Sequence, residues 1–366
     1  MTAKRPTISD VAASAGVSKA TVSAVLNDSD TVKDATRDRV LTAIELLNYR
    51  PTQLGGRNAA TRRDRAIGVL IKEYDNPYYA EVIAGARSVA DARGYTLLVV
   101  SSEGEYGAEH KAVAILRGKD VDGLIATPVL DEHADLSHFF ELKRRNVPFV
   151  LLEEVRGVRA SIVDVDNVEA SRRAVEHLFA LGHTRVVHFA GPAYSAHSEE
   201  RIAGVHRAFG SSHLAFTDDV IVRAGAHLAD GYRAGLALFR RKGETPTGVT
   251  CYNDLVAIGL CRALRELGRR VPEDVSVVGY DDVPLCDYLA VPLTSMHVPK
   301  SEMGERAAEM LIRQIESKQP PAPEKVYLDA ALVVRGSTGP PPAAAAGAAA
   351  PAGALPRARR GSAARA

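Results

Sequence analysis

Near its start the chain carries a short run of small and polar side chains with the spacing of a helix face. Val22, Val25 and Leu26 fall on one face of a helix expected over residues 18–27. The opposite face carries Ser18, Lys19, Ala20, Thr21, Ser23, Ala24 and Asn27. Lysine can donate to guanine, an alanine methyl can contact thymine, and hydroxyl and amide groups suit phosphate oxygens. These residues therefore suit contact with DNA; the alternative is that they only decorate a solvated helix face.

Residues with catalytic or metal-binding spacing are missing from the sequence. No Ser-His-Asp order, nucleophile elbow, P-loop or dinucleotide-binding glycine motif occurs. His183 and His188 share no metal spacing with a carboxylate. Cys251, Cys261 and Cys286 form no CxxC pair. We therefore expect no enzyme activity, no cofactor and no bound metal.

Charge is divided unevenly along the chain. Residues 1–65 contain 11 Lys and Arg and 7 Asp and Glu, and residues 337–366 contain four Arg and no acid. Because the whole chain has a net charge of +1, residues 66–336 carry a net charge of −7. An acidic body behind a basic head suggests that the head alone contacts a polyanion. No apolar run approaches the roughly 18 residues that span a bilayer, and the start lacks a secretory signal, so we expect a cytoplasmic protein.

Three short helices are expected to position the polar face. Thr7, Ser18 and Asp34 are suitable N-caps, and Gly16 separates the first helix from the second. Apolar residues recur at helical spacing in all three segments. Three helices with a tight glycine turn between the first two are typical of a helix-turn-helix domain, which we assign to residues 1–51.

Apolar runs alternate with helical stretches after a polar, basic linker over residues 52–65. The expected strands cover 66–71, 95–100, 121–127, 147–152, 185–191, 219–223, 248–253 and 275–282. The expected helices cover 80–93, 108–117, 135–145, 167–181, 199–209, 229–241 and 254–267. This alternation is typical of parallel sheets covered on both faces. Residues 66–336 should form two doubly wound α/β lobes with a ligand cleft between them. Residues 337–366, rich in Pro and Ala, are predicted to be a disordered tail.

Several motifs follow one another in the head and the body. The head contains DVA-x-x-AGVS (10–18), ATVSAVLN (20–27) and TRDRVLTAIELLNYRP (36–51). In order and spacing, these closely resemble the DNA-binding domain of the lactose-repressor/galactose-repressor (LacI/GalR) family of bacterial transcription regulators. The body matches the family's effector domain, which is similar to periplasmic sugar-binding proteins. Its motifs are NPYYAEVIAGA (76–86), VDGLI (121–125), LGHTRVVHFAGP (181–192), RIAGVHRAF (201–209), YNDLVAIGL (252–260), VPEDVSVVGYDD (271–282) and PLTSM (292–296). The resemblance covers residues 6–336.

The resemblance implies which side chains of the head read bases. In the family, the first two residues after the helix cap and one residue a turn later contact base edges. Those positions here hold Lys19, Ala20 and Ala24. Phosphate contacts are expected of Thr21, Ser23 and Asn27. Because an alanine methyl cannot hydrogen-bond, discrimination between bases at the third position, Ala24, should be weak or steric.

The linker departs from the family pattern. Family members usually fold a short helix there, and a leucine from it wedges into the minor groove. The aligned residue here is Asn58, and Gly55 and Gly56 lie inside the expected helix, each costing about 1 kcal/mol relative to alanine. Asn58 can still hydrogen-bond in the minor groove, Arg57 can seek its negative potential, and Leu54 is a candidate for a shifted wedge. A plain flexible linker is the alternative.

The resemblance also implies a sugar pocket between the lobes. Its matched residues are Tyr78, Tyr79, Thr127, Glu153, Arg201, Asn253 and Asp281. Arg201 offers a fork of donors, Asn253 a donor and an acceptor, and Asp281 two acceptors for paired hydroxyls. Because this set offers one cation, we expect a neutral sugar or polyol rather than a phosphorylated sugar. A purine base stacked on the tyrosines is the competing choice, and His227 is a further candidate contact.

Together these patterns predict a sequence-specific DNA-binding regulator, a repressor, whose affinity for its operator is controlled by a small molecule. One head offers too few base contacts alone, so a homodimer on a pseudo-palindromic operator in double-stranded DNA is expected, at the bacterial nucleoid when bound. No leucine heptad follows Arg335, so we expect no tetramer-forming helix. The alternatives are a periplasmic-type solute-binding protein, which would lack the basic head, and a sugar-modifying enzyme with an accessory DNA-binding domain.

Overall fold

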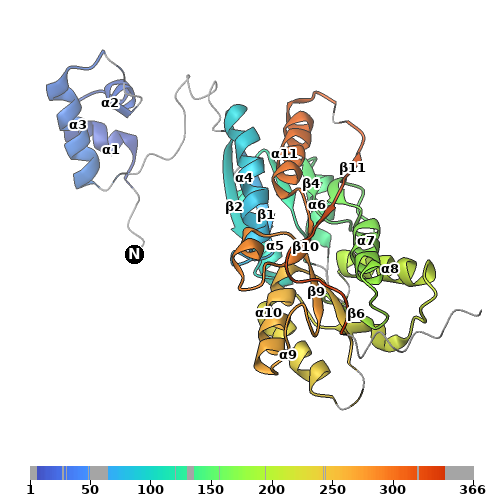
Figure 1. Ribbon diagram of the computed structural model, residues 1–366. Helices are drawn as coiled ribbons and strands as arrows, with labels where there is room; N and C mark the ends of the chain where they lie inside the picture. The colour runs from blue at the N-terminus through green and yellow to red at the C-terminus, as the bar shows by residue number, and fades with distance from the viewer. Residues whose placement is uncertain are drawn as a thin grey trace, which may run out of the picture. The chain divides into compact units, whose positions relative to one another are not determined.

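Two compact units, residues 1–65 and 66–366, divide the chain (Figure 1). The computed structural model describes residues 6–26, 29, 31–47, 49, 65–119, 121–129, 136–155, 157–193, 195–241, 243, 245–319 and 321–342. Across these ranges, no helix is both long and apolar enough to cross a membrane.

The first unit contains the expected helices. They are α1 (Ile8–Ala15), α2 (Lys19–Leu26) and α3 (Asp34–Leu46). Their apolar stripes meet in a small core in which Val11, Val22 and Val40 are fully buried. Gly16 ends α1 with a φ of 65°, a left-handed conformation that glycine adopts without strain. One detail differs from the sequence prediction: Asp34 is the first residue of α3, not its cap.

Lobe 1 of the second unit is built on a six-stranded sheet with the strand order β11-β5-β4-β3-β1-β2. Its strands, all parallel, are β1 (Ala66–Ile71), β2 (Thr96–Ser101), β3 (Gly123–Ala126), β4 (Phe149–Leu151), β5 (Ser161–Val165) and β11 (Lys325–Leu328). Its helices are α4 (Pro77–Ala92), α5 (Tyr106–Gly118), α6 (Ser137–Arg144) and α11 (Lys300–Glu316). Every residue of β1 is buried, as expected for a sheet covered on both faces.

Lobe 2 repeats this architecture with the strand order β12-β10-β9-β8-β6-β7. Its strands are β6 (Val186–Ala190), β7 (Ile221–Arg223), β8 (Gly248–Cys251), β9 (Ser276–Asp281), β10 (Thr294–His297) and β12 (Ala331–Val333). Its helices are α7 (Asn167–Ala180), α8 (Ala196–Gly210), α9 (Leu228–Phe239) and α10 (Asp254–Glu266), with short 3-10 turns at Asp218–Val220 and Pro284–Tyr288. The sheets differ at one edge, because β12 is antiparallel to β10 whereas β11 is parallel to β5.

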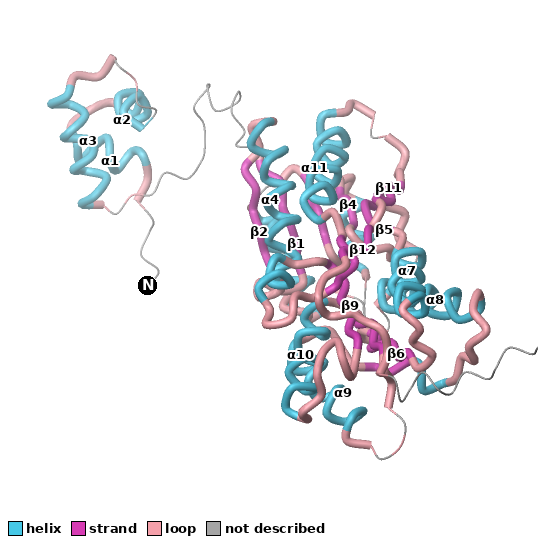
Figure 2. Tube along the Cα trace, viewed as in Figure 1, coloured by secondary structure: helices cyan, strands magenta, loops and turns pink. Residues whose placement is uncertain are grey.

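The chain crosses between the lobes three times, after β5, β10 and β11 (Figure 2). As a result, α7 packs against α8 in lobe 2, and α11 packs against α4 in lobe 1. The second contact is close. A Cβ added at Gly304 would lie 2.0 Å from the carbonyl oxygen of Val82, and one added at Gly85 would lie 2.0 Å from that of Ser301. Glycine is therefore required at both positions of this helix contact. The three crossings are the segments that join the two lobes.

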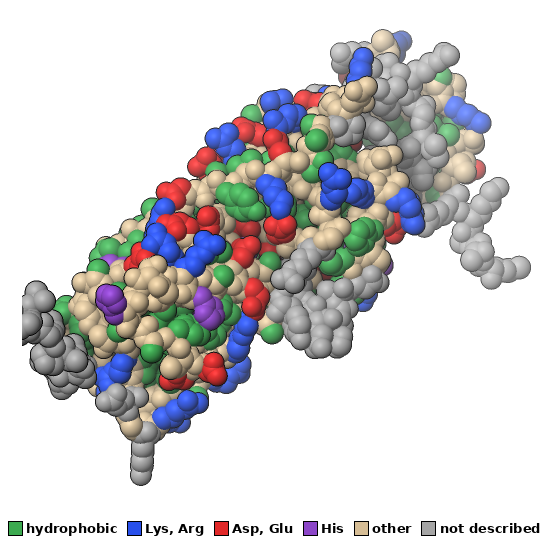
Figure 3. All heavy atoms as spheres, turned by 90° about the vertical axis from the view of Figure 1, so that its right-hand side faces the viewer, with side chains coloured by type: hydrophobic (Ala, Val, Ile, Leu, Met, Phe, Trp, Pro, Cys, Tyr) green, Lys and Arg blue, Asp and Glu red, His purple; other side chains and the backbone are tan. Residues whose placement is uncertain are grey.

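Surface charges of the second unit are largely paired along and between its elements. Examples are Arg173 with Asp329 at 3.0 Å and Arg270 with Asp274 at 3.0 Å. On the face drawn in Figure 3, acidic and basic side chains lie interspersed. Such pairs are each worth roughly 0–1 kcal/mol. A mixed surface of this kind presents no extended positive field to a polyanion.

The sequence pattern predicts most strands of the two sheets but misses β5, β10, β11, β12 and helix α11. The two inner strands missed, β5 and β10, bury polar side chains through hydrogen bonds rather than an apolar run. Asp164 in β5 is 2% exposed and accepts the backbone N–H of Val165 at 2.8 Å. Ser295 in β10 is fully buried and donates to Asp254 at 2.6 Å. Hydrophobic periodicity cannot detect strands of this kind.

The prediction that residues 337–366 form a disordered tail is wrong for residues 337–342. Ser337 is fully buried, where its hydroxyl donates to the carbonyl of Val277 at 2.6 Å and accepts the amide of Thr294 at 2.8 Å. Gly339 accepts the Ser276 hydroxyl at 3.0 Å. These contacts extend lobe 2 past its last strand without any periodic pattern. Residues 343–366 lie outside the described residues.

Candidate functional site

Helix α2 holds its predicted reading residues on the side away from the core. Ser18, Lys19 and Ala20 are exposed, and Thr21, Ser23 and Ala24 are partly buried. The Ser18 hydroxyl accepts the backbone N–H of Thr21 at 3.1 Å and lies 2.9 Å from the Thr21 hydroxyl, so Ser18 caps the helix. The other predicted DNA contacts, Asn27, Leu54, Arg57 and Asn58, lie outside the described residues.

A cleft between the two lobes leaves about 560 Å³ free of protein atoms, part of which is open to solvent. Six of the seven predicted pocket residues line it: Tyr78, Tyr79, Thr127, Arg201, Asn253 and Asp281. The seventh, Glu153, is fully buried and pairs with Lys72, which lines the cleft. Thr127 follows β3, Asn253 follows β8, and Asp281 ends β9. The carboxyl ends of parallel strands therefore form the walls, as in other doubly wound folds.

Arg201 reaches the cleft from α8 as a fully desolvated cation. It is 5% exposed, its Nε donates to the Oδ1 of Asn167 at 3.0 Å, and its Nη1 donates to the carbonyl oxygen of Tyr252. The guanidinium carbon lies 3.6 Å from the ring centroid of Tyr280 and 4.7 Å from that of Tyr252. Two aromatic faces and two acceptors thus fix its orientation. Since a guanidinium carries five N–H donors, others remain for a ligand.

Asp281 occupies a strained turn at the end of β9. Its φ is 105° and that of Asp282 is 55°, both in the left-handed region that non-glycine residues rarely adopt. Lys300, itself 1% exposed, holds this turn, because its ammonium donates to the carbonyl oxygens of Asp281 at 2.6 Å and Asp282 at 2.9 Å. Burial raises the pKa of the Asp281 carboxyl to about 7, although the nearby Arg201 lowers it. The carboxyl can therefore donate as well as accept near neutral pH.

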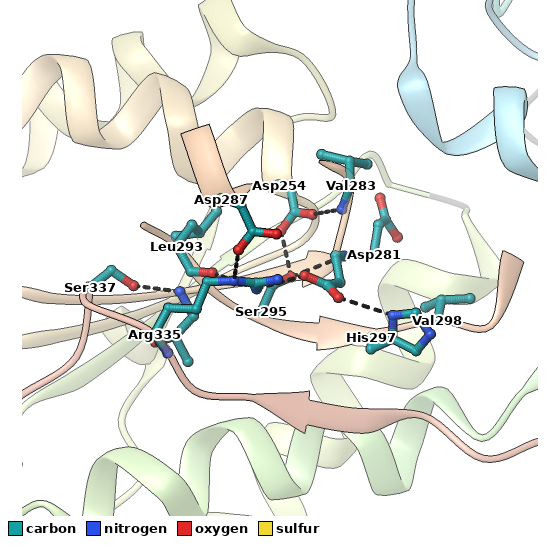
Figure 4. Close-up of polar contacts among 12 residues, drawn as sticks. Asp254, Asp281, Val283, Asp287, Leu293, Ser295, His297, Val298, Arg335 and Ser337 are labelled. Carbon is teal, nitrogen blue, oxygen red and sulfur yellow. Dashed lines mark hydrogen bonds and ion pairs between the residues drawn. The ribbon is translucent and has the colours of Figure 1, made fainter. Parts of the chain in front are cut away.

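A polar network behind the turn fixes its backbone (Figure 4). The fully buried Asp254 accepts the Ser295 hydroxyl at 2.6 Å, and the same hydroxyl accepts the Asp282 amide at 3.1 Å. Asp282 is paired with Arg335 at 2.6 Å and with His297 at 3.0 Å. These contacts engage Asp254 and Asp282, and leave Asp281 as the carboxylate of the group that lines the cleft.

Asn253 is largely engaged in capping a helix, whereas the hydroxyl of Thr127 is left without a partner in the described part of the chain. The Asn253 Oδ1 accepts the backbone N–H of Val256 at 2.9 Å, and its Nδ2 donates to the Ala226 carbonyl at 2.8 Å. Asn253 thus caps α10, and its amide retains one N–H for a ligand. The buried Thr127 hydroxyl finds no hydrogen-bond partner among the described residues. A buried hydroxyl of this kind is costly unless a ligand or a water satisfies it.

The sequence pattern does not single out Lys72, His197 or Tyr252, which also line the cleft. Lys72 lies 2.6 Å from Glu153. Burial alone would raise the pKa of Glu153, but the charges of Lys72 and His197 lower it to about 2. The position of Lys72 in the sequence could have indicated that it lines the cleft, because it directly follows β1 as Thr127 follows β3.

Within the described residues, no group of three or more His, Cys, Asp and Glu side chains could hold a metal ion. Cys251 and Cys286 are buried free thiols, and burial raises the pKa of both. Such thiols behave as small apolar side chains rather than as nucleophiles.

Comparison with known proteins covers both units. Residues 7–52 match the family described as bacterial regulatory proteins, lacI family, and residues 175–338 match a periplasmic binding protein-like domain. The HTH-type transcriptional repressor PurR of Vibrio vulnificus is 32% identical over 324 residues, covering 86% of this chain and 93% of the relative. The repressor of that name from Aliivibrio fischeri is 34% identical over 314 residues, covering 85% and 92%.

Solved structures show the same likeness. The complex of the transcriptional regulator CelR with cellobiose is 32% identical, with a TM-score of 0.67 over 91% of this chain and all of that one. The lac repressor dimer bound to operator and ONPF is 29% identical, with a TM-score of 0.68 over 92% of this chain and all of that one. A LacI family regulator from Enterococcus faecium with bound ribose is 26% identical, with a TM-score of 0.67 over 75% of this chain and 99% of that one.

The matches in sequence and in structure extend across the helix-turn-helix unit and both lobes, and every relative named above is a transcriptional regulator or repressor. They agree with the three-helix unit and the two-lobed architecture described above. The chain belongs to the lacI family of bacterial regulatory proteins.

Proposed function

We propose that this protein is a homodimeric, sequence-specific repressor that acts on nucleoid DNA in the cytoplasm and responds to a sugar bound between its lobes. The observation that carries the proposal is the cleft, which gathers Arg201, Asp281 and Tyr78 from distant parts of the chain into one cavity. The neighbouring lac repressor dimer is bound to operator, and the CelR and Enterococcus faecium structures contain cellobiose and ribose. These support DNA and a sugar as the two ligands.

On DNA, α2 would enter the major groove with its N-terminus first. Lys19 would donate to guanine O6 or N7, Ala20 would contact a thymine methyl, and Ala24 would add a steric filter. Phosphate contacts would come from Thr21, Ser23 and Asn27. The linker would bind the minor groove through Arg57 and Asn58, or through Leu54 as a wedge, and would bend the operator less than an apolar wedge at residue 58 does.

A neutral sugar fits the cleft better than an anion does because carboxyl groups lie beside both of the cations Lys72 and Arg201. Lys72 is paired with Glu153 at 2.6 Å, and Arg201 lies near the Asp281 carboxyl. A phosphate would have to displace Glu153 from Lys72 or bind Arg201 beside Asp281. The Asp281 carboxyl and the unpartnered Thr127 hydroxyl instead suit the alternating donors and acceptors of sugar hydroxyls.

The test uses the full-length protein and an operator selected from random DNA. Ribose, cellobiose, a sugar phosphate and adenine are titrated into the free protein and into the protein–operator complex. A neutral sugar should bind and change operator affinity, and by linkage operator should change sugar affinity by the same factor. Arg201→Ala should keep operator binding by the free protein and lose the response.

Two results would contradict the proposal. If adenine or the sugar phosphate alone couples to operator binding, the assigned ligand class is wrong. If Arg201→Ala responds with an unchanged midpoint, the ligand does not bind in this cleft. Arg207→Ala, an exposed change on the same helix, is the matched control.

A further inference from the structure

Carboxylates on lobe 1 face imidazoles on lobe 2, and each such pair carries opposite charges when the imidazole is protonated. Lobe 1 presents Glu73 after β1, Glu153 after β4 and Asp164 in β5. Lobe 2 presents His197 at the start of α8 and His227 at the start of α9. These groups come from opposite lobes, so the contacts between them depend on how closely the lobes approach each other.

The inner contact is buried. The His197 Nε2 lies 2.9 Å from the Asp164 Oδ2, with side chains 12% and 3% exposed. Next to it, the Ser195 hydroxyl donates to the Glu153 Oε1 at 3.3 Å, and the His197 backbone N–H donates to the same oxygen at 3.5 Å. The first turn of α8 is therefore bound to two carboxylates of the opposite lobe.

The outer contact lies nearer to solvent. The His227 Nε2 lies 2.8 Å from the Glu73 Oε1, and its Nδ1 lies 3.0 Å from the Asp230 Oδ2. The imidazole is 54% exposed. With both ring nitrogens directed at carboxylate oxygens, the ring can donate to both only when it is protonated.

All charged groups around the two rings bear on this arrangement. His197 is near the carboxyls of Asp164, Glu153, Glu200 and Asp281 and near the cation Arg201, and Lys72 is paired with Glu153. Burial lowers the pKa of His197, but Asp164 and Glu153 outweigh it, and the net direction is upward. For His227 burial also lowers the pKa, while Glu73 and Asp230 raise it to a net increase.

Buried His188 provides a contrast within lobe 2. Its pKa falls to about 3, because burial and the nearby cations Arg201 and Arg223 oppose its charge. It stays neutral across the physiological range. Burial lowers the pKa of both imidazoles. The pKa of His197 is nevertheless raised, because carboxylates of the opposite lobe lie beside it, whereas cations lie beside His188.

We propose that protons are a second ligand of this cleft: closing the lobes binds protons at His197 and His227, so that acidity stabilises the closed effector domain. A group whose pKa is raised in one state stabilises that state at low pH and loses the effect as the pH rises through the raised value. Closure should therefore weaken as the pH rises through the titration of the two imidazoles. The consequence for operator binding rests on the proposed function; proton-linked closure itself does not.

The first measurement follows each imidazole in the full-length protein by hydrogen exchange at the ring carbon, read by mass spectrometry. His197 should titrate above the ordinary histidine value of about 6.5. Asp164→Asn should return it to that value or below, and should leave exposed His213 unchanged. A His197 that titrates below 6.5 in the wild type, or is indifferent to Asp164→Asn, overturns the proposal for the inner contact. Glu73→Gln tests the outer contact on His227 in the same way.

The second measurement follows lobe closure directly. Spin labels are placed at Lys119 and Glu273, which precede β3 and β9 at the ends away from the cleft, in a Cys261→Ala background. The distance distribution should move toward the closed form between pH 8 and pH 6. His197→Gln, which keeps a donor but cannot titrate, should remove most of this shift, and His213→Gln should not. A distribution that ignores pH in this range overturns the proposal. Neither measurement needs effector or operator, so either can fail while the proposed function stands.

Discussion

The outward face of α2, which we propose contacts DNA, and the proposed effector cleft hold similar kinds of side chain in different ways. On α2, Ser18, Lys19 and Ala20 are exposed, and Ser18 bonds to Thr21 within one helical turn. In the cleft, Arg201 and Asp281 are 5% and 6% exposed and are held by residues far away in the sequence. The proposed DNA contacts on the helix depend on local structure, whereas the proposed effector contacts of the cleft depend on the tertiary fold.

This difference predicts how substitutions should behave. A buried charged group that loses its partner costs stability as well as function, because the remaining charge is desolvated and unpaired. An exposed side chain on a helix changes stability by roughly 0.5 kcal/mol or less. Cleft variants should therefore alter stability and response together, whereas a substitution of an exposed α2 residue such as Lys19 should alter DNA binding with little change in stability.

The largest effect is expected for Glu153→Gln. Glu153 is fully buried beside Lys72, so the substitution should cost about 3 kcal/mol of unfolding free energy at pH 7. Because the pKa of Glu153 is lowered to about 2, its contribution is present above pH 4.5 and is lost as the pH falls from 4.5 toward 2. Urea unfolding at pH 7 and pH 3 measures both values. Glu154→Gln is the control, since Glu154 makes an exposed pair with Lys325. An equal loss of unfolding free energy in the two variants would show that burial does not strengthen the Glu153 pair.

Asp281→Asn should have an effect of opposite sign. Burial raises the pKa of this carboxyl to about 7, so its ionisation opposes folding as the pH rises from 3.8 through 7. At pH 8 the variant should be about 2 kcal/mol more stable, somewhat less than the pKa implies because the new amide N–H groups need partners. The gain should vanish near pH 4, and the effector response should be lost. Thermal unfolding against pH, with exposed Asp91→Asn as control, decides it; a loss of stability at pH 8 would contradict the cause given for the pKa.

Ser18→Ala should cost about 1 kcal/mol in the first unit, since it removes the acceptor of the Thr21 amide at 3.1 Å. Amide hydrogen exchange across α2 in the full-length chain reports the loss of protection. Ser14→Ala, an exposed change within α1, should leave protection unchanged. Identical exchange in wild type and Ser18→Ala would mean that the cap does not stabilise the helix.

The smallest effect on stability, within about 0.5 kcal/mol, is expected for Lys19→Ala. Its effect on DNA should nevertheless be specific, with a loss of about 1–3 kcal/mol for the preferred base. Thr21→Ala should instead weaken binding to all sites alike, as expected for a phosphate contact. Selection on randomised half-sites compares the two, and an unchanged base preference for Lys19→Ala would remove that residue from base reading.

Much of the fold followed from local pattern. Helix α10, observed at Asp254–Glu266, was predicted at 254–267, and β1 was predicted at its observed bounds, 66–71. In both, apolar spacing and the boundary residues point to one structure. β5 and residues 337–342 were missed because their polar groups are satisfied by distant partners, such as Val277 for Ser337.

The residues of the candidate cleft likewise fall into those that the sequence predicted and those that it did not. Position at the end of a strand, together with family motifs, was enough to predict Asn253 and Asp281 as lining residues, and the family motif alone predicted Arg201. It did not predict His197 or Lys72, whose importance lies in pairs with Asp164 and Glu153 across roughly 30 to 80 residues of sequence. No spacing rule links such partners.

Local sequence is enough to set the three helices of the first unit and the side chains that α2 turns outward, because a helix repeats every 3.6 residues whatever surrounds it. It is also enough to set the alternation that requires parallel sheets. Only the tertiary structure places carboxylates on one lobe opposite imidazoles on the other, buries Arg201 between two tyrosine rings and raises the pKa of Asp281. Desolvation and through-space charge decide these properties, and both depend on which distant residues the fold brings within a few ångströms.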